Sequence, residues 1–599
     1  YDNISPSMFA FNGNAWNSLM KMTDVTVDGG VITGATFKNA LTVYDLINRQ
    51  ATVDTDSYDL KATWNDERWF ASTQLGSTKA SGGTGRQVFG EFLNWADYSY
   101  DISGTPSLTF SGTNPFTDPS AFQIDGGYAS PWHTNPPAED NWAAGWGGNI
   151  VTKPTWDEEK YGQIDFGVRL DSPVYQIRFG AKRREHETGQ SMAGVALASI
   201  AGYGNPQASQ FNPRPLPDNY LSGFGNTGDL SERFTIDGWA LANYILSGNW
   251  LAPWQTMPEP GTFNDPSFVS NTWTVSEDIS AAYVQADYSW NNFRGNLGFR
   301  YVQTESDSMG WQCTTGASCS ATGYEQVNVR KKYNDFLPNL NVAYDFSNDV
   351  VLRFSAAKVM SRPNYGDMSN YLWLGPQTLT GGGGNPDLDP YRSTNWDFSA
   401  EWYFAENSIL AGTLFYKDVS DYILVTTQEE THFNQNQGRD TVYDVSRPNN
   451  AGNASIQGFS AAFQQTFGAG FGLLANYTYA DAEADNGDPL PYNSKNQVNV
   501  SPFFENDDWS ARVTYSWRSK YYTQVDRGNF LVTDDYDSLD ANITYRINEF
   551  LSVSLDGMNL LDTNYYTYAE VEGIANTEKL VRGDYRTGRR YMATLRVQF

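Results

Sequence analysis

Residues that could carry redox or metal chemistry are few in this 599-residue chain. Its two cysteines, Cys313 and Cys319, lie six positions apart with Gly and Ser between them, a spacing that suits neither a C-x-x-C redox pair nor a four-ligand zinc site. We expect a loop-closing disulfide in an oxidising compartment, with two unpaired thiols as the alternative. The three histidines, His133, His186 and His432, are too dispersed for a histidine-based centre. We therefore predict no catalytic residues and no metal site of this kind.

Two segments resemble ligand-binding loops without meeting their requirements. The acidic run at 481–488 holds Asp481, Asp485 and Asp488, but it lacks the full spacing of an EF-hand calcium loop. We interpret it as a solvated acidic loop and leave a bound Ca²⁺ open; no other cofactor is expected. The four glycines at 381–384 lack the Lys-Ser/Thr and the following helix of a phosphate-binding loop. We expect a flexible loop there.

Tryptophans in segments rich in Gly, Asn, Asp and Pro could bind a substrate by stacking. Exposed aromatic rings pack well on the apolar faces of sugars and on planar catechol groups. The alternative is that most of these rings only hold loops together or lie at a membrane interface. The candidates for substrate contact are Trp142, Trp146, Trp239, Trp254, Trp311 and Trp373.

Composition excludes several classes of protein. The chain has 40 Lys+Arg against 69 Asp+Glu, a net charge of −29, which argues against a duplex nucleic-acid partner. Aromatic residues make up 15% of the chain, whereas disordered chains lack them. No run of 18 apolar residues occurs and the mean hydropathy is −0.53, so the chain is not a helical membrane protein.

The elements that would position these residues are strands with period-two alternation. Leu297, Phe299 and Tyr301 alternate with Asn296 and Arg300, and the last segment, 590–599, alternates in the same way. The polar face carries charges at mid-strand, as a wet lumen permits, and the apolar face ends in aromatic residues, as an interfacial girdle requires. Both features indicate an all-β transmembrane antiparallel β-barrel rather than a soluble β-sandwich or propeller.

Connections between these strands alternate in length. Long links beside short turns predict a barrel with extended loops on its extracellular rim and tight turns on the other. The short turns lie near 291, 348, 406, 469, 507 and 548, and the long links run roughly over 186–277, 303–333, 358–391, 424–452 and 561–588.

Strand counting gives about 17 strands, the earliest near 54–64 and 67–79. An odd number cannot close a single-chain bacterial barrel with both ends in the periplasm. The first strand runs toward the short-turn rim, so we expect residues 1–53 to belong to an extracellular loop region and 54–599 to form the barrel. A complete barrel would have about 22 strands. We therefore expect the chain to be the C-terminal portion of a longer protein.

Four segments together resemble one known family. They are the strand and Arg-Pro loop at 353–369, the Gly-Asn-Pro-x-Leu-x-Pro segment at 381–390, the Asn-Leu-x-Asp strand end at 553–565, and an alternating last strand that ends in Phe. In this order they resemble the TonB-dependent outer-membrane receptors. The motif residues are Arg362, Pro363, Asn385, Pro386, Asn559 and Phe599.

The resemblance implies an active transporter of the bacterial cell outer membrane, not an enzyme. In that family the substrate binds in a vestibule of loops and upper plug, and energy comes from TonB-ExbB-ExbD through the plug. Neither the plug nor its TonB box is visible in this chain, so we expect the plug upstream or on a separate polypeptide. Other expected partners are outer-membrane lipid, a small-molecule nutrient and a surface lipoprotein. A short basic run consists of Lys182, Arg183 and Arg184. Those that face outward would contact lipopolysaccharide phosphates, and the alternative is that they are simple charges at the rim.

The expected substrate class rests on the charge of the loops and on the family resemblance. Acidic loops repel strongly anionic ferric siderophores, which favours a neutral or cationic nutrient. The resemblance is to the larger receptors that take up carbohydrates or similar nutrients. A receptor for a ferric siderophore or another metal chelate is the first alternative. A plugless passive porin and a soluble Trp-rich protein that binds or cleaves glycans are the others.

Overall fold

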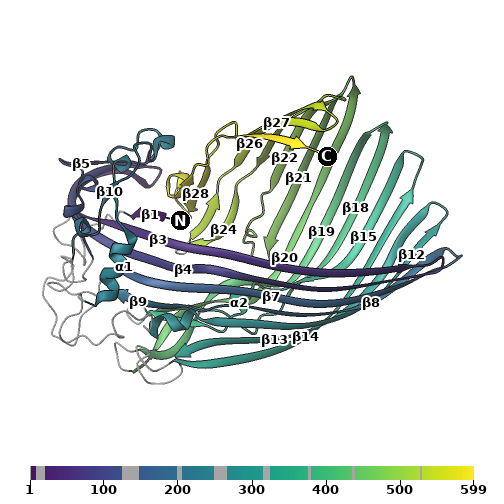
Figure 1. Ribbon diagram of the computed structural model, residues 1–599, viewed down its shortest axis with the longest axis horizontal. Coiled ribbons are helices and arrows are strands. Elements are labelled where there is room, and N and C mark those ends of the chain that lie inside the picture. Colours follow the sequence, from purple (N-terminus) through teal and green to yellow (C-terminus); the bar gives the residue numbers. More distant parts are fainter. Residues whose placement is uncertain are drawn as a thin grey trace.

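The computed structural model describes residues 2–7, 21–124, 148–197, 206–248, 266–313, 324–375, 379–434, 439–526 and 529–598. Within them, antiparallel strands joined edge to edge in chain order form one curved wall (Figure 1). These strands number 17, as the sequence predicted. They are β3 (Val31–Asn65), β4 (Trp69–Asp101), β7 (Gly148–Arg169), β8 (Val174–Gln190), β12 (Trp273–Trp290), β13 (Phe293–Cys313), β14 (Tyr324–Asp345), β15 (Val350–Ser361), β18 (Tyr391–Ala405), β19 (Ser408–Asn434), β20 (Arg439–Gly468), β21 (Phe471–Ala484), β22 (Asn496–Glu505), β23 (Trp509–Arg518), β26 (Tyr536–Asn548), β27 (Leu551–Met558) and β30 (Arg590–Val597).

Shorter elements lie mostly at one rim of this wall. The described helices include none long and apolar enough to cross a membrane. The short strands are β1 (Asp2–Ser7), β2 (Lys21–Asp28), β5 (Ser107–Phe110), β6 (Gln123–Ile124), β9 (Ala193–Leu197), β10 (Arg214–Pro215), β11 (Phe234–Thr235), β16 (Leu372–Gly375), β17 (Thr380–Gly383), β24 (Tyr521–Asp526), β25 (Asn529–Thr533), β28 (Tyr565–Glu570) and β29 (Val581–Tyr585). The helices are α1 (Gly238–Ser247), α2 (Tyr365–Met368) and the 3-10 turns η1 (Pro115–Thr117), η2 (Pro119–Ala121), η3 (Ala208–Gln210), η4 (Ser222–Phe224), η5 (Asp229–Ser231), η6 (Pro266–Asn271) and η7 (Thr577–Lys579).

Alternation along each strand separates two faces of the wall, as predicted. On β13, Leu297, Phe299 and Tyr301 are exposed on one face. On the other face Asn296 accepts a hydrogen bond from Asn341 at 2.9 Å, and Arg178 of β8 forms a bidentate pair with Asp287 of β12. A large apolar surface left open on one face and polar pairs on the other correspond to lipid outside and water inside.

Tight turns at the other rim join the strands where the sequence places them. The β12–β13 turn has Asn291 at φ 52°, and the β18–β19 turn has Asn407 at φ 54°. Asparagine tolerates this left-handed conformation better than most residues, which explains its place in the turns. Every expected short turn therefore occurs, and one rim is formed by tight connections.

Two of the predicted long loops are wrong, because they are strands. The segment 303–333 is largely the upper part of β13 and β14, and 424–452 is largely the upper part of β19 and β20. Both hairpins continue their ladders beyond the band of exposed apolar residues. There neither face needs lipid-compatible side chains, so the alternation that marks a strand in the sequence fades while the backbone pairing persists.

The first strand also begins earlier than expected, at Val31 rather than near residue 54. It runs without a break across the expected boundary between 53 and 54. Its two parts differ in surroundings: residues 51–65 are exposed, whereas most of the described side chains in 31–50 are buried or partly buried. The division of the chain at residue 53 stays a prediction.

Aromatic residues form a second hydrophobic core at the long-loop rim. We call this unit, residues 31–50, 86–124, 148–151 and 206–248, the rim module. Upper β3 and β4 supply Tyr44 and Phe92, η1 supplies Phe116, and the segments around β6 and β11 supply Phe122 and Phe234, all at most 3% exposed. Edge-to-face ring contacts join them, such as Tyr44 to Phe234 at 5.0 Å between centroids. The loops after β4 and β8 are therefore packed together and are not independent.

The first and last parts of the wall also meet at this rim. The hairpin of β2 and β3 carries Asp28, which accepts a hydrogen bond from Asn576 at 2.8 Å and forms an ion pair with Lys579. Arg586, in the same late loop, donates to the carbonyl of Gly223 in the rim module. Segments more than 500 positions apart in sequence are thus in contact at this rim.

Candidate functional site

The loop after β15, residues 362–390, folds over the lumen-facing side of the wall. Its helix α2 places Met368 against Val275 of β12, and Leu388 and Ile423 complete the same buried cluster. Ser308 of β13 donates a hydrogen bond to the carbonyl of Met368 at 2.8 Å. Apolar contact and hydrogen bonding therefore hold this loop at the mouth of the barrel.

A buried carboxylate is the polar centre of this contact. The side chain of Glu277 on β12 is 0% exposed. It accepts hydrogen bonds from the hydroxyls of Tyr365 at 2.9 Å and Tyr333 at 3.4 Å, and Arg362 Nε lies 3.4 Å away. A buried charge needs such partners, because desolvation otherwise makes it costly. Glu277 comes from β12, Tyr333 from β14, and Arg362 and Tyr365 from the loop itself, so the network ties the loop to two strands.

A histidine lies next to this network. The His186 ring stacks on Tyr365 at 4.6 Å between centroids, and its Nε2 lies 3.1 Å from both carboxylate oxygens of Asp157. Burial and the nearby Glu277 raise the pKa of the Tyr365 hydroxyl, which therefore stays protonated and able to donate. Sequence reasoning set His186 aside and missed Glu277. β8 and β12 pair in a register that places His186 opposite Glu277. Residue spacing in the sequence does not show this register, so no sequence signal pointed to the contact.

The motif residues that carried the family resemblance hold loops in place. Arg362 donates to Thr304 Oγ1 at 2.8 Å, and Pro363 is buried beside it. Asn385 donates to the carbonyl of Pro448 at 3.0 Å, and its own side-chain oxygen caps the following turn. Asn559 adopts φ 52° at the end of β27. Each of these three side chains therefore stabilises a strand-to-loop junction.

Some candidate residues lie outside the described residues. These are the cysteine pair's Cys319, the tryptophans Trp142, Trp146 and Trp254, and the terminal Phe599. The backbone of Cys313 ends β13, but its side chain is not described. Pro386 lies in the turn between β17 and β18.

Trp373 lines a cavity of about 480 Å³ beside the loop 362–390. The indole is 46% exposed. Around it the cavity presents the carboxylates of Asp367 and Asp444 together with hydroxyls of Thr427 and Ser446. Burial raises the pKa of Asp367 above its ordinary value, although an Asn364 hydrogen bond partly opposes this. The arrangement offers one aromatic platform and several hydrogen-bonding groups to a small molecule.

The glycine run beneath Trp373 is an ordered strand, so the expected flexible loop is wrong. β17 pairs antiparallel with β16 and parallel with β20. A Cβ at Gly382 would lie 2.6 Å from Trp373 Nε1, and one at Gly384 would lie 2.0 Å from the carbonyl oxygen of Ser369. Only glycine allows so close an approach on these faces. The run serves packing of the indole and the neighbouring backbone.

The other two described tryptophan candidates lie elsewhere. Trp239 begins α1 in the rim module, is 43% exposed, and carries the Arg86 guanidinium 4.5 Å above its ring. Trp311 belongs to β13 and shares the face of Leu297 and Phe299, which is the side away from the lumen. The structure therefore brings neither of them to the Trp373 cavity.

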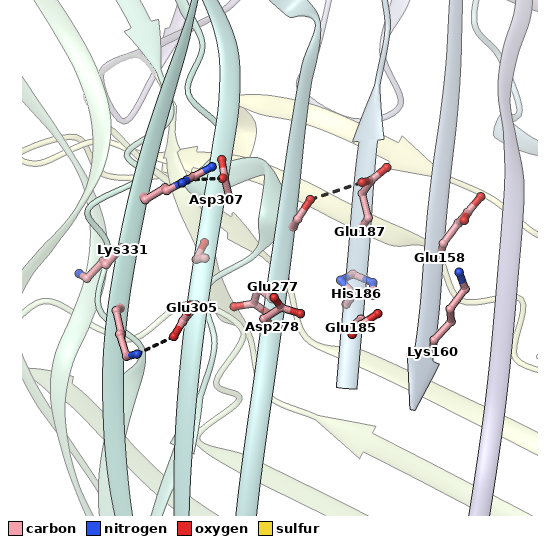
Figure 2. Close-up of a pocket in the computed structure, with 14 residues that line it drawn as sticks. Glu158, Lys160, Glu185, His186, Glu187, Glu277, Asp278, Glu305, Asp307 and Lys331 are labelled. Carbon is pink, nitrogen blue, oxygen red and sulfur yellow. Dashed lines mark hydrogen bonds and ion pairs between the residues drawn. The ribbon is translucent and has the colours of Figure 1, made fainter. Parts of the chain in front are cut away.

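Charged side chains form a hollow of about 710 Å³ on the outward face of the wall (Figure 2). One row across four strands consists of Glu185, Asp278, Glu305 and Lys332, which are direct register partners. It follows the lipid-facing residues of the same strands, and Lys332 pairs with Glu305 at 2.5 Å. The outward face thus changes from apolar to charged above the level of Tyr301.

The basic run 182–184 lies in the middle of β8 and divides between the two faces, as strand geometry requires. Arg183 faces outward and pairs with Asp278 at 3.2 Å. Lys182 faces the lumen over the Tyr161 ring at 4.6 Å, and Arg184 pairs with Glu159 at 3.4 Å. The three residues do not form one patch.

The acidic run 481–488, which begins in the last residues of β21, is held by separate partners. Asp481 pairs with Lys495 at 2.8 Å, Asp485 accepts from Asn453, and Asp488 accepts from Asn486. Within the part of the chain that the structure describes, no three His, Cys, Asp or Glu residues are grouped to hold a metal ion.

A wall with a lipid-facing outer side, a polar inner side and large folded loops at one rim defines a receptor-type barrel of the bacterial outer membrane. The chain belongs to the TonB-dependent receptor family, since the family profile described as "TonB dependent receptor-like, beta-barrel" matches residues 94–560. This family comprises receptors and transporters that work with TonB on small-molecule substrates. The match accounts for the fold and for the location in the outer membrane.

Solved structures with a similar fold include three uptake receptors. The ferric yersiniabactin uptake receptor FyuA from Yersinia pestis is 12% identical, with 97% of this chain and 74% of that chain covered at a TM-score of 0.48. The siderophore receptor PirA from Acinetobacter baumannii is 12% identical, covering 94% and 77% at 0.47. The Ferric-Catecholate import receptor Fiu from K12 E. coli is 12% identical, covering 96% and 78% at 0.47. No curated protein matches the sequence.

Proposed function

We propose that this TonB-dependent receptor takes up a neutral carbohydrate or oligosaccharide and that the Trp373 cavity forms part of its binding site. The observation that carries the proposal is a half-exposed indole set among carboxylates and hydroxyls in one cavity. An indole stacks on the apolar face of a sugar ring, while carboxylates accept hydrogen bonds from its hydroxyls. Folding of the loop 362–390 against Glu277 positions this platform.

Charge in the cavity favours a neutral substrate. Among the described residues, its lining includes Asp367 and Asp444 and no lysine or arginine. A strongly anionic ferric siderophore would meet repulsion there, because the neighbouring Arg447, which donates to the Gly384 carbonyl, is already paired with Glu430. A cationic group would be tolerated, and a neutral polyol would use the carboxylates as acceptors.

Partners complete the proposal. Energy coupling would come from TonB-ExbB-ExbD through a plug domain. Arg183 and its charged neighbours on the outward face, placed above the lipid-facing band, would contact lipopolysaccharide phosphates. A surface lipoprotein would cover the folded loops, and Ca²⁺ in the acidic loop after β21 stays a proposal of the same kind.

The test is uptake by cells that carry the receptor in place of their own copy. Labelled oligosaccharides and ferric siderophores are supplied separately, with Trp373→Ala compared to Trp290→Ala. Trp290 serves as the matched control. It is 62% exposed at the tight-turn rim, whereas the cavity lies at the long-loop rim. We expect oligosaccharide uptake that falls about ten-fold in Trp373→Ala, which corresponds to ~1.4 kcal/mol of binding. Uptake of ferric siderophores alone would show that the metal-chelate alternative is correct.

A further inference from the structure

The rim module buries an arginine among aromatic rings. Arg233 is 6% exposed, and its guanidinium lies 5.1 Å from the Phe116 ring centroid and 5.7 Å from that of Tyr220. Its Nε donates to the carbonyl of Leu230 at 2.5 Å. Aromatic faces stabilise a cation, but they do not accept the remaining N–H groups in the plane of the guanidinium.

One end of this guanidinium lacks an acceptor. The Nη1 atom is buried and has no hydrogen-bond partner among the described residues. Burial lowers the pKa of Arg233, and the groups that oppose this are the Tyr220 and Tyr44 hydroxyls, with no carboxylate among them. Buried charges in proteins are normally paired, and a buried N–H without an acceptor costs roughly 1–3 kcal/mol. A buried cation that has no carboxylate partner among the described residues therefore points to a group that is bound at this position.

A cavity of about 680 Å³ adjoins Arg233. Its walls come from η1 and η2 on one side and from the β10–β11 hairpin on the other, where the Leu216 amide donates to the Arg233 carbonyl at 2.8 Å. The prolines at 119, 213, 215 and 217 line it with Leu216 and Phe234. These rigid apolar side chains form a surface that changes little on binding.

We propose that this cavity binds a small organic anion, with its single carboxylate or phosphate accepting a hydrogen bond from Arg233 and its remaining atoms packed on the prolines. Asp218 and Glu232 also line the cavity, so each negative charge beyond the first would weaken binding of a ligand. One anionic group can approach the guanidinium, since the bond to a charged acceptor exceeds the repulsion from carboxylates at the rim. The site lies in the rim module and is separate from the Trp373 cavity, so the proposal does not rest on carbohydrate uptake.

Thermal unfolding of the purified, detergent-solubilised receptor provides the test. Four probes are compared at equal ionic strength: sodium glucuronate, sodium phosphate, sodium acetate and neutral glucose, with sodium chloride as the reference. We expect a saturable rise in Tm with glucuronate, phosphate or both, and none with glucose. The stronger of the two shifts identifies carboxylate or phosphate as the preferred group. No shift beyond that of sodium chloride would overturn the proposal.

Variants locate the effect. Arg233→Gln should lose at least ten-fold in anion affinity, whereas Arg86→Gln, in the same module but outside the cavity, should keep it. Asp218→Asn removes a rim carboxylate and should strengthen binding about two-fold. A folded Arg233→Gln receptor that still binds the anion with wild-type affinity would overturn the proposal. If Arg233→Gln does not fold, the Asp218→Asn titration decides, and an unchanged anion affinity in that variant would overturn the proposal. Trp373→Ala should leave the anion-dependent shift unchanged.

Discussion

The Tyr365 hydroxyl donates a hydrogen bond of 2.9 Å to the Glu277 carboxylate, which joins a loop to the barrel wall across 88 positions of sequence. The bond is enclosed on two sides, by Arg362 and by the stacked His186 ring. It fixes the start of the loop that carries Trp373. The geometry of the cavity therefore depends on a contact with Glu277, which is far from Trp373 in the sequence.

Removing this hydroxyl should loosen the loop. Tyr365→Phe leaves the ring stacked on His186 but deprives the buried Glu277 of its shortest hydrogen bond, at a cost of about 1.5–3 kcal/mol. We expect faster cleavage within 362–390 by a protease added to the intact receptor. Tyr301→Phe, a change on the lipid-facing side of β13, is the control and should cut at the wild-type rate. Equal rates for the two variants would show that the bond does not hold the loop.

Gly382 should be needed for the position of Trp373. A methyl group there would lie 2.6 Å from the indole nitrogen, so Gly382→Ala must displace the ring. We expect about a ten-fold loss of oligosaccharide affinity in a direct binding measurement. Gly412→Ala on β19 is the matched control, because it does not line the cavity and a Cβ at that position meets nothing within 4 Å. An unaffected Gly382→Ala receptor would mean that the indole does not contact substrate.

Acid should weaken substrate binding through Asp367. Burial raises the pKa of this carboxyl, so it takes up a proton at a higher pH than an exposed aspartate, whose ordinary value is about 3.9. As the pH falls toward this raised pKa, the Asp367 carboxylate is therefore lost before an exposed aspartate would take up a proton. Oligosaccharide affinity of the wild type should fall as this carboxylate is lost. In Asp367→Asn the oligosaccharide affinity should be lower at pH 7 and should not change as the pH falls. Parallel pH profiles for the two receptors would show that Asp367 does not bind the substrate.

The two faces of β13 should respond oppositely to a new charge. Leu297→Arg places a cation toward lipid and should cost about 2–4 kcal/mol, whereas Asn296→Arg places it toward the lumen, where Asp287 is its register partner. Reversible unfolding by denaturant in lipid vesicles measures both. Equal losses of stability would contradict the assignment of faces.

Much of the wall could be predicted because it depends on local alternation. Leu297 and Phe299 on one side and Asn296 and Arg300 on the other show the period of a strand, and the tight turns at Asn291 and elsewhere show where strands end. A side chain in a strand faces lipid or water according to its parity alone. Strand number, the two faces and the family motifs therefore followed from the sequence. The upper hairpins did not, because water on both faces removes the alternation.

The candidate site was decided by tertiary structure. His186, Glu277, Tyr333 and Tyr365 are unremarkable in sequence, and they meet only because strand register aligns β8, β12 and β14 beneath a folded loop. The rim module and its buried Arg233 likewise arise from two loops that pack together. Alternation is a property of neighbours along the chain, which a sequence displays. Contact between distant segments depends on strand register and loop packing. These are set by the free energy of the complete fold, and no short stretch of sequence displays them.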